Sequence, residues 1–217
     1  MGRYAVANGT RRRWTLRTSA DDAFGVTMAA MTVFEFLLAL YAIVAGLGVS
    51  LLVTSVGQMI EARDRVQLYW VHSCWIALTF VGHVVSWFTI WRFRDHAPWT
   101  VLQALLLLSV PILLYLISHL AVPDLEDDRI HKMRDYYFRH ARWTQGLLLA
   151  AVVAGALSHF LIEDKFDLSG ARGVRVSLIL ILLPGIVSRN PRVHAAQAVL
   201  LFAAIAIAAS YLSQPIS

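Results

Sequence analysis

The chain has 217 residues, of which 58% are hydrophobic and only 15% charged, and its formal net charge is +5. Soluble domains usually have roughly 45–50% apolar and about 25% charged residues, so this composition argues against an ordinary soluble protein. The arginines stand mostly at the ends of apolar runs, where they are expected to meet lipid headgroups, so the positive charge gives no support to nucleic-acid binding. The single cysteine, Cys74, has no partner for an internal disulfide.

Residues 1–22 are polar and basic, and we expect them to form a flexible tail ahead of a single transmembrane domain over residues 23–217. Six apolar runs follow, most of them near the length of about 20 residues that a membrane-spanning helix needs. The predicted spans are about 28–60, 67–91, 98–122, 143–162, 174–188 and 193–212. The fifth is short, and its Pro-Gly pair is expected to break it, which leaves open whether it crosses the bilayer fully.

The polar connection between the third and fourth runs has an amphipathic pattern. Ile130, Met133, Tyr137 and Ala141 recur at helical spacing, which predicts a helix on the membrane surface near residues 124–142 that runs into the fourth span. The predicted fold is therefore an all-α polytopic bundle of about six transmembrane helices plus one interfacial amphipathic helix. The acidic residues of this connection are interpreted as a solvated charge cluster, and we predict no metal site.

Glu35 is a carboxylate within the first apolar run. Counted in helical steps, it begins a row of small residues that includes Gly46, Ser50 and Gly57. Small residues let another helix approach closely in lipid, so this row is predicted to pack inside the bundle, with Glu35 facing its interior or its mouth. Two interpretations of Glu35 stay open: a proton or cation site, or an anchor at the level of the headgroups.

Polar residues of the second and third runs are the other candidates for an intramembrane site. His72, Thr79 and His83 line one side of the second predicted helix, and Tyr115 and His119 follow the mid-span Pro111. The two histidines of the second run are about 16 Å apart along a helix, so they cannot bind one metal ion together. The predicted polar site is Glu35, His72, Thr79, His83, Tyr115 and His119, and Gly146, Ala150 and Ala154 form a second predicted packing row.

These patterns lead to three alternative functions. The favoured one is a small transporter or channel-like module whose polar site handles protons or a small cation. The alternatives are a redox subunit whose histidines bind haem or a quinone, and a scaffold or assembly component without catalytic residues. We expect no cofactor unless haem is bound, no enzymatic activity, and as partners the lipid bilayer and either further copies of the chain or another membrane protein. Phrases such as "FEFLLAL" and "YWVHSCW" are typical of small bacterial multi-span proteins, so the expected location is the bacterial inner membrane.

Overall fold

The computed structural model describes residues 31–123, 125, 130–163 and 171–212. By its contacts the chain divides into two units, Met1–Thr32 and Val33–Ser217, and every described helix belongs to the second unit. The predicted tail and the start of the first span lie outside the described residues.

Helices make up nearly all of the described part of the second unit. They are α2 (Val33–Glu61), α3 (Trp70–Ile90), α4 (Val101–His119), α5 (Met133–Glu163), α6 (Ala171–Val187) and α7 (Pro191–Leu212). A 3₁₀ turn, Trp91–Phe93, extends α3, and two short strands, β1 (Val66–Gln67) and β2 (His131–Lys132), pair in parallel. The all-α prediction is confirmed.

Among the described residues, four helices are long and apolar enough to cross a membrane: α2, α3 with its 3₁₀ extension, α4 and the segment Met133–Ile162 of α5. The apolar stretches Val176–Val187 and Pro191–Ile207, in α6 and α7, are shorter. These lengths are compatible with an integral membrane protein and include four of the six predicted spans.

Local chemistry explains where several helices begin. Thr100 caps α4, because its side-chain oxygen accepts from the Gln103 backbone N–H at 3.3 Å while the Gln103 side chain accepts from the Thr100 N–H at 2.9 Å. The predicted start at Pro98 was therefore early by three residues. Pro191 occupies the first position of α7, where its missing N–H costs nothing.

Two predictions about helix boundaries were wrong. The predicted surface helix near 124–142 does run into the fourth span, as the single helix α5, but it begins only at Met133. Residues 131–132 form β2 instead, and residues 124 and 126–129 lie outside the described part. The Pro184-Gly185 pair does not break α6, which continues to Val187. The contacts that carry α6 past Pro184 are part of the candidate site.

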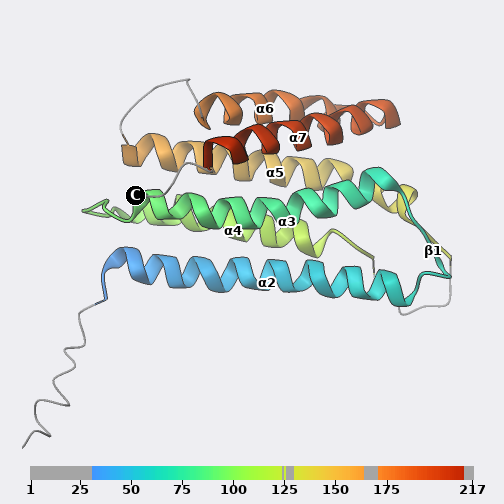
Figure 1. The fold of residues 1–217 in the computed structure, drawn as a ribbon, viewed down its shortest axis with the longest axis horizontal. Coiled ribbons are helices and arrows are strands. Elements are labelled where there is room, and N and C mark those ends of the chain that lie inside the picture. Colours follow the sequence, from blue (N-terminus) through green and yellow to red (C-terminus); the bar gives the residue numbers. More distant parts are fainter. Residues whose placement is uncertain (1–30, 124, 126–129, 164–170, 213–217) are drawn as a thin grey trace, which may run out of the picture. The chain divides into compact units, whose positions relative to one another are not determined.

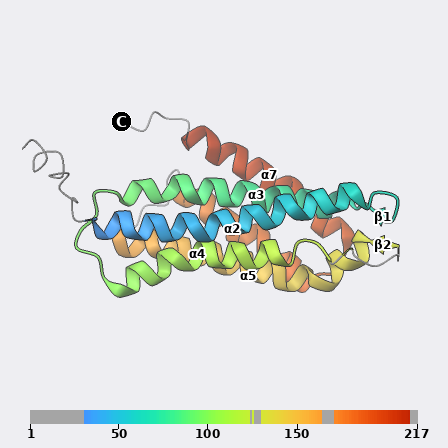
Figure 2. The same cartoon turned by 90° about the horizontal axis from the view of Figure 1, so that it is seen from below.

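The helices of this unit pack in a definite order. α2 contacts α3 and α4, α5 contacts α4 and α6, and α7 contacts α6 and α3. In Figure 1, α2 therefore lies on one side of α3 and α4, while α6 and α7 lie on the other. Figure 2 shows α2, α3 and α4 lying nearly parallel, with α7 inclined to them.

The outer surface of the unit is strongly apolar. Every helix carries large exposed hydrophobic side chains, for example Ile43, Phe88, Leu105, Leu157, Leu180 and Val199, which are between 45% and 62% exposed. Soluble proteins seldom expose apolar surface on all sides, whereas lipid-facing helices do. The surface chemistry of α6 and α7 thus matches that of the four longer helices.

Candidate functional site

Three of the predicted site residues lie buried on α3. The imidazole of His72 donates from Nε2 to the carbonyl oxygen of Ala121 at 2.7 Å, and the Thr79 hydroxyl donates to the Trp75 carbonyl at 2.8 Å. His83 lies 3.0 Å, measured from Nε2, from the Ser118 hydroxyl oxygen. Each residue is thus held by a different partner.

The other three predicted site residues are placed elsewhere. Glu35 lies exposed in the first turn of α2, and His119 lies exposed in the last turn of α4. These turns are at opposite ends of the bundle, because α2 and α4 run in the same direction with α3 returning between them (Figure 1). Tyr115 is half-buried on α4. The six residues therefore do not form one site.

The predicted small-residue row of α2 lies on the outer side of the helix, away from the other helices of the chain. Gly46 and Ser50 are exposed, and a Cβ built on Gly46 or on Gly57 would have nothing within 4 Å. The prediction that this row packs against another helix of the same chain was wrong, because the bulkier stripe of α2 makes the contacts. That buried stripe consists of Phe34, Leu37, Tyr41, Ala45, Gly48, Leu52 and Met59.

The second predicted packing row is divided between two environments. On α5, Ala150 is exposed and Gly146 is half-buried with open space around it, whereas Ala154 is buried. Only the end of this row therefore packs inside the chain. Contact of either row with another molecule stays a prediction.

α2 and α3 come close together at His83. A Cβ built on Gly48 would run into the imidazole ring of His83, so only glycine fits at this position. The Ser118 hydroxyl donates to the Leu114 carbonyl at 3.0 Å, and its oxygen can therefore accept the Nε2–H of His83. His83 is 1% exposed, and it links α3 to α4 beneath α2.

A buried polar network joins α5, α6 and α7, and the sequence analysis missed it. His194 donates from Nε2 to the Ser188 carbonyl at 2.9 Å, which leaves Nδ1 as an acceptor. Nδ1 lies 2.8 Å from the Tyr137 hydroxyl and 2.9 Å from Nε2 of Gln145. The same Gln145 amide nitrogen lies 3.3 Å from Oε1 of Gln197. All four side chains are at most 5% exposed.

This network explains how α6 continues through Pro184. Proline has no N–H, so the carbonyl oxygen of Leu180, four residues earlier, loses its helical bond, and the proline ring crowds this turn. Gln197 Nε2 donates to the carbonyl oxygens of Ile181 and Leu182 in that turn, at 2.6 and 3.2 Å. Gly185 lets the two glutamines come this close, because a Cβ there would collide with both side chains. The signal in the sequence was two uncharged amides within apolar runs.

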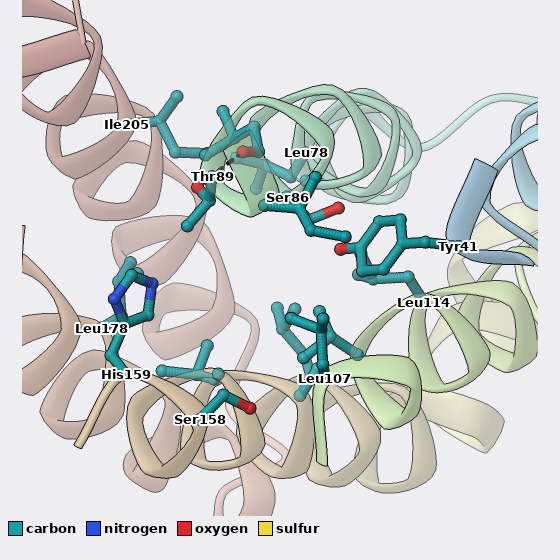
Figure 3. Close-up of a pocket in the computed structure, with 18 of the residues that line it drawn as sticks. Tyr41, Leu78, Ser86, Thr89, Leu107, Leu114, Ser158, His159, Leu178 and Ile205 are labelled. Atoms are coloured by element: carbon teal, nitrogen blue, oxygen red, sulfur yellow. Dashed lines mark hydrogen bonds between the residues drawn. The ribbon is translucent and has the colours of Figure 1, made fainter. Parts of the chain in front are cut away.

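A cavity lies in the other half of the bundle. It has a volume of about 260 Å³ and lies between α3, α4, α5, α6 and α7, with Tyr41 of α2 at its edge. Figure 3 shows side chains from these helices around an open centre. Its apolar wall includes Leu78, Leu114, Leu148, Leu182, Leu201 and Ile205.

Polar groups of the cavity gather towards the ends of α3 and α5. These two helices end on the same side of the bundle, and their C-terminal parts, with the 3₁₀ turn that extends α3, provide Thr89, Arg92, Ser158 and His159. The hydroxyls of Thr89 and Ser158 donate to carbonyl groups of their own helices at 2.8 and 2.9 Å, so their oxygens can still accept a hydrogen bond. The cavity is therefore apolar at one end and polar at the other.

Between these ends, a pair of hydroxyl groups lies at the edge of the cavity. The Tyr41 hydroxyl lies beside Ser86, whose own hydroxyl donates to the His83 carbonyl at 2.9 Å. Figure 3 shows the Tyr41 and Ser86 oxygens directed towards each other. The pair connects the cavity to the buried His83 region of α3.

No group of three or more His, Cys, Asp or Glu side chains suited to a metal ion occurs among the described residues. The acidic residues 124, 127 and 128 lie outside that part of the chain. Comparison with protein-family models, curated proteins and solved structures finds no match.

Proposed function

We propose that the chain is an integral membrane protein that binds a small hydrophobic molecule with a polar group in the cavity between α3 and α7. The observation that carries this proposal is the 260 Å³ cavity, with leucine side chains along one part and hydroxyl, imidazole and guanidinium groups at one end. Ligand pockets are typically apolar with a few convergent polar groups.

The cavity has room for such a ligand. An apolar protein cavity of about 150 Å³ is large enough to bind benzene, and this one is larger. The ligand's polar group would lie near Thr89, Ser158 and His159, and its apolar part along the leucines. Quinones belong to this class of molecule, so the quinone alternative of the sequence analysis is compatible with the cavity.

The proposal includes six membrane spans. At 1.5 Å per residue, the 17 residues of α6 span about 26 Å, close to the hydrocarbon thickness of about 30 Å, and the 22 residues of α7 span about 33 Å. Their exposed apolar side chains, such as Leu180 and Val199, support a position among lipids. The bacterial inner membrane is the proposed location.

The transporter or channel-like function stays a prediction. The buried imidazoles of His72 and His83 favour it, since ionisable groups inside a membrane bundle are often part of a proton path. If the hydrophobic ligand passes through the cavity, ligand binding and transport are two parts of one function.

Ligand binding can be tested with a matched pair of glycine substitutions on α5. Gly155 lines the cavity, and a Cβ there would be 3.8 Å from Cγ2 of Val110, whereas Gly146 does not line the cavity and has open space around it. Gly155→Leu is expected to weaken binding about tenfold, equal to about 1.4 kcal/mol, because its side chain fills the cavity. Gly146→Leu is expected to bind like the original chain.

The measurement is energy transfer from the protein's tryptophans to anthroyloxy-stearic acid, in lipid nanodiscs with and without the protein. Saturable transfer that Gly155→Leu weakens and Gly146→Leu preserves would support the proposal. Absence of saturable binding, or equal binding by both variants, would contradict it and would favour the scaffold alternative.

A further inference from the structure

A second, much smaller cavity lies in the half of the bundle that contains the polar network. Its volume is about 20 Å³, and it lies between α3, the end of α4 and the first turns of α5. Seven of its lining residues carry polar side-chain atoms: His72, Trp75, Thr79, Tyr136, Tyr137, His140 and Thr144. Most of its wall is apolar, so the few polar atoms that it does reach decide whether it holds water.

Two of the lining residues each carry a buried nitrogen without a hydrogen-bond partner: Nδ1 of His72 and Nε1 of Trp75. Both residues are 4% exposed, so bulk water does not reach them. Because Nε2 of His72 donates to the Ala121 carbonyl, Nδ1 of the neutral ring carries a lone pair and needs a donor. The indole N–H of Trp75 can only donate and needs an acceptor.

These needs define the chemistry of the occupant. It must accept from an indole N–H and donate to an imidazole nitrogen, which excludes a metal cation and an apolar gas. A buried water needs roughly 10–15 Å³ and usually makes two to four hydrogen bonds. The cavity therefore holds one water, and a larger polar molecule does not fit.

We propose that this cavity binds one ordered water molecule that accepts a hydrogen bond from Trp75 Nε1 and donates one to His72 Nδ1. A third bond is available, because the hydroxyls of Thr79 and Thr144 already donate to carbonyl groups of their own helices, at 2.8 and 3.2 Å. Either oxygen can accept the second proton of the water. The water thus satisfies two groups that would otherwise be buried without partners.

The water also places the buried histidines in one connected region. Tyr137 lines the same cavity, and its hydroxyl lies 2.8 Å from Nδ1 of His194. His72 on α3 and His194 on α7 thus lie on two sides of a polar region that contains the water and Tyr137. The proposed water is hydrogen-bonded to Nδ1 of His72. This is the nitrogen that would take up a proton if the neutral ring became charged. This proposal stands independently of the larger cavity and its ligand.

Solid-state NMR of the whole chain in lipid bilayers tests the water site. With ¹⁵N-labelled tryptophan and histidine, magnetisation transfer from water to the indole N–H is measured for each tryptophan. Trp99 is the internal control, since its Nε1 is also buried without a hydrogen-bond partner but lines neither cavity. We expect strong transfer at Trp75 and weak transfer at Trp99, and a His72 Nδ1 shift typical of a hydrogen-bonded acceptor nitrogen. Equal transfer at both tryptophans, or none at Trp75, would overturn the proposal.

A pair of variants on α3 provides the second test. Thr79→Leu places a larger apolar side chain in the wall of the small cavity, whereas Thr89→Leu makes the same change at a hydroxyl that lines the large cavity. Thr79→Leu is expected to abolish water transfer to Trp75, and Thr89→Leu to leave it unchanged. Full water transfer to Trp75 in a folded Thr79→Leu protein would refute the water site. If that variant does not fold, the comparison of Trp75 with Trp99 in the original chain decides whether the water is present.

Discussion

The two halves of the bundle use the same helices in opposite ways. Near the strands, α5, α6 and α7 fill their interior with Tyr137, Gln145, His194 and Gln197, which hydrogen-bond one another and the backbone. Towards the other end of α3 and α5, the same bundle encloses a cavity of about 260 Å³. The first half is built for fixed geometry, and the second leaves space for another molecule.

Glycine shows this contrast most directly. In the network half, Gly185 removes a side chain so that two glutamines can occupy its place. In the cavity half, Gly82 and Gly155 line the open space, and a Cβ at either would meet a side chain of α4 only at ordinary contact distance, 3.5 Å from Leu114 and 3.8 Å from Val110. A glycine thus permits close packing in one half of the bundle and borders a cavity in the other.

Gly185→Leu should have the largest effect on stability. The new side chain would displace Gln145 and Gln197, so overpacking of about 1–3 kcal/mol adds to the loss of buried hydrogen bonds. We expect a large fall in the thermal midpoint in detergent. Gly155→Leu, in the cavity half, should stay close to the original midpoint. Equal destabilisation by the two variants would show that the halves do not differ in packing.

His194→Phe should have the next largest effect. The change keeps the ring but removes both nitrogens, which leaves the Tyr137 hydroxyl and the Ser188 carbonyl without their partner, at a cost of about 1–3 kcal/mol for each buried group. Ser158→Ala, at the polar end of the cavity, removes only a bond within its own helix and should change stability far less. Denaturation of both variants in mixed micelles provides the comparison, and a Ser158→Ala effect as large as that of His194→Phe would contradict it.

Gly82→Ala should produce a small change of opposite sign. A Cβ at Gly82 would be 3.5 Å from Cδ2 of Leu114, an ordinary contact, so alanine should stabilise the helix by about 0.5–1 kcal/mol through its better helix propensity. The matched control is Gly48→Ala, where the same added methyl group collides with His83 and should destabilise the chain. Thermal midpoints that move in the same direction for both variants would contradict this expectation.

Much of the fold was predictable from apolar runs, because the length of a membrane-spanning helix follows from bilayer thickness and the helical rise. Helical spacing also identified His72, Thr79 and His83 as one side of α3, and all three are buried. The same spacing identified Gly46 and Gly57 in α2, whereas the glycine in close contact is Gly48. Helical periodicity defines rows of residues but does not say which row meets a neighbouring helix.

By itself the sequence indicated an all-α chain whose composition is compatible with an integral membrane protein, since this depends only on composition and on length along the chain. The tertiary structure alone decided which polar groups meet. Gln145 and Gln197 are 52 residues apart, yet their amide groups are 3.3 Å apart. Gln197 also donates to the carbonyl oxygens of Ile181 and Leu182, in the turn before the Pro184-Gly185 pair that the sequence pattern had predicted to be a break. The physical reason is that hydrogen bonds and cavities depend on which helices are neighbours and on their rotation about their axes. Neither property is contained in the pattern of a single helix.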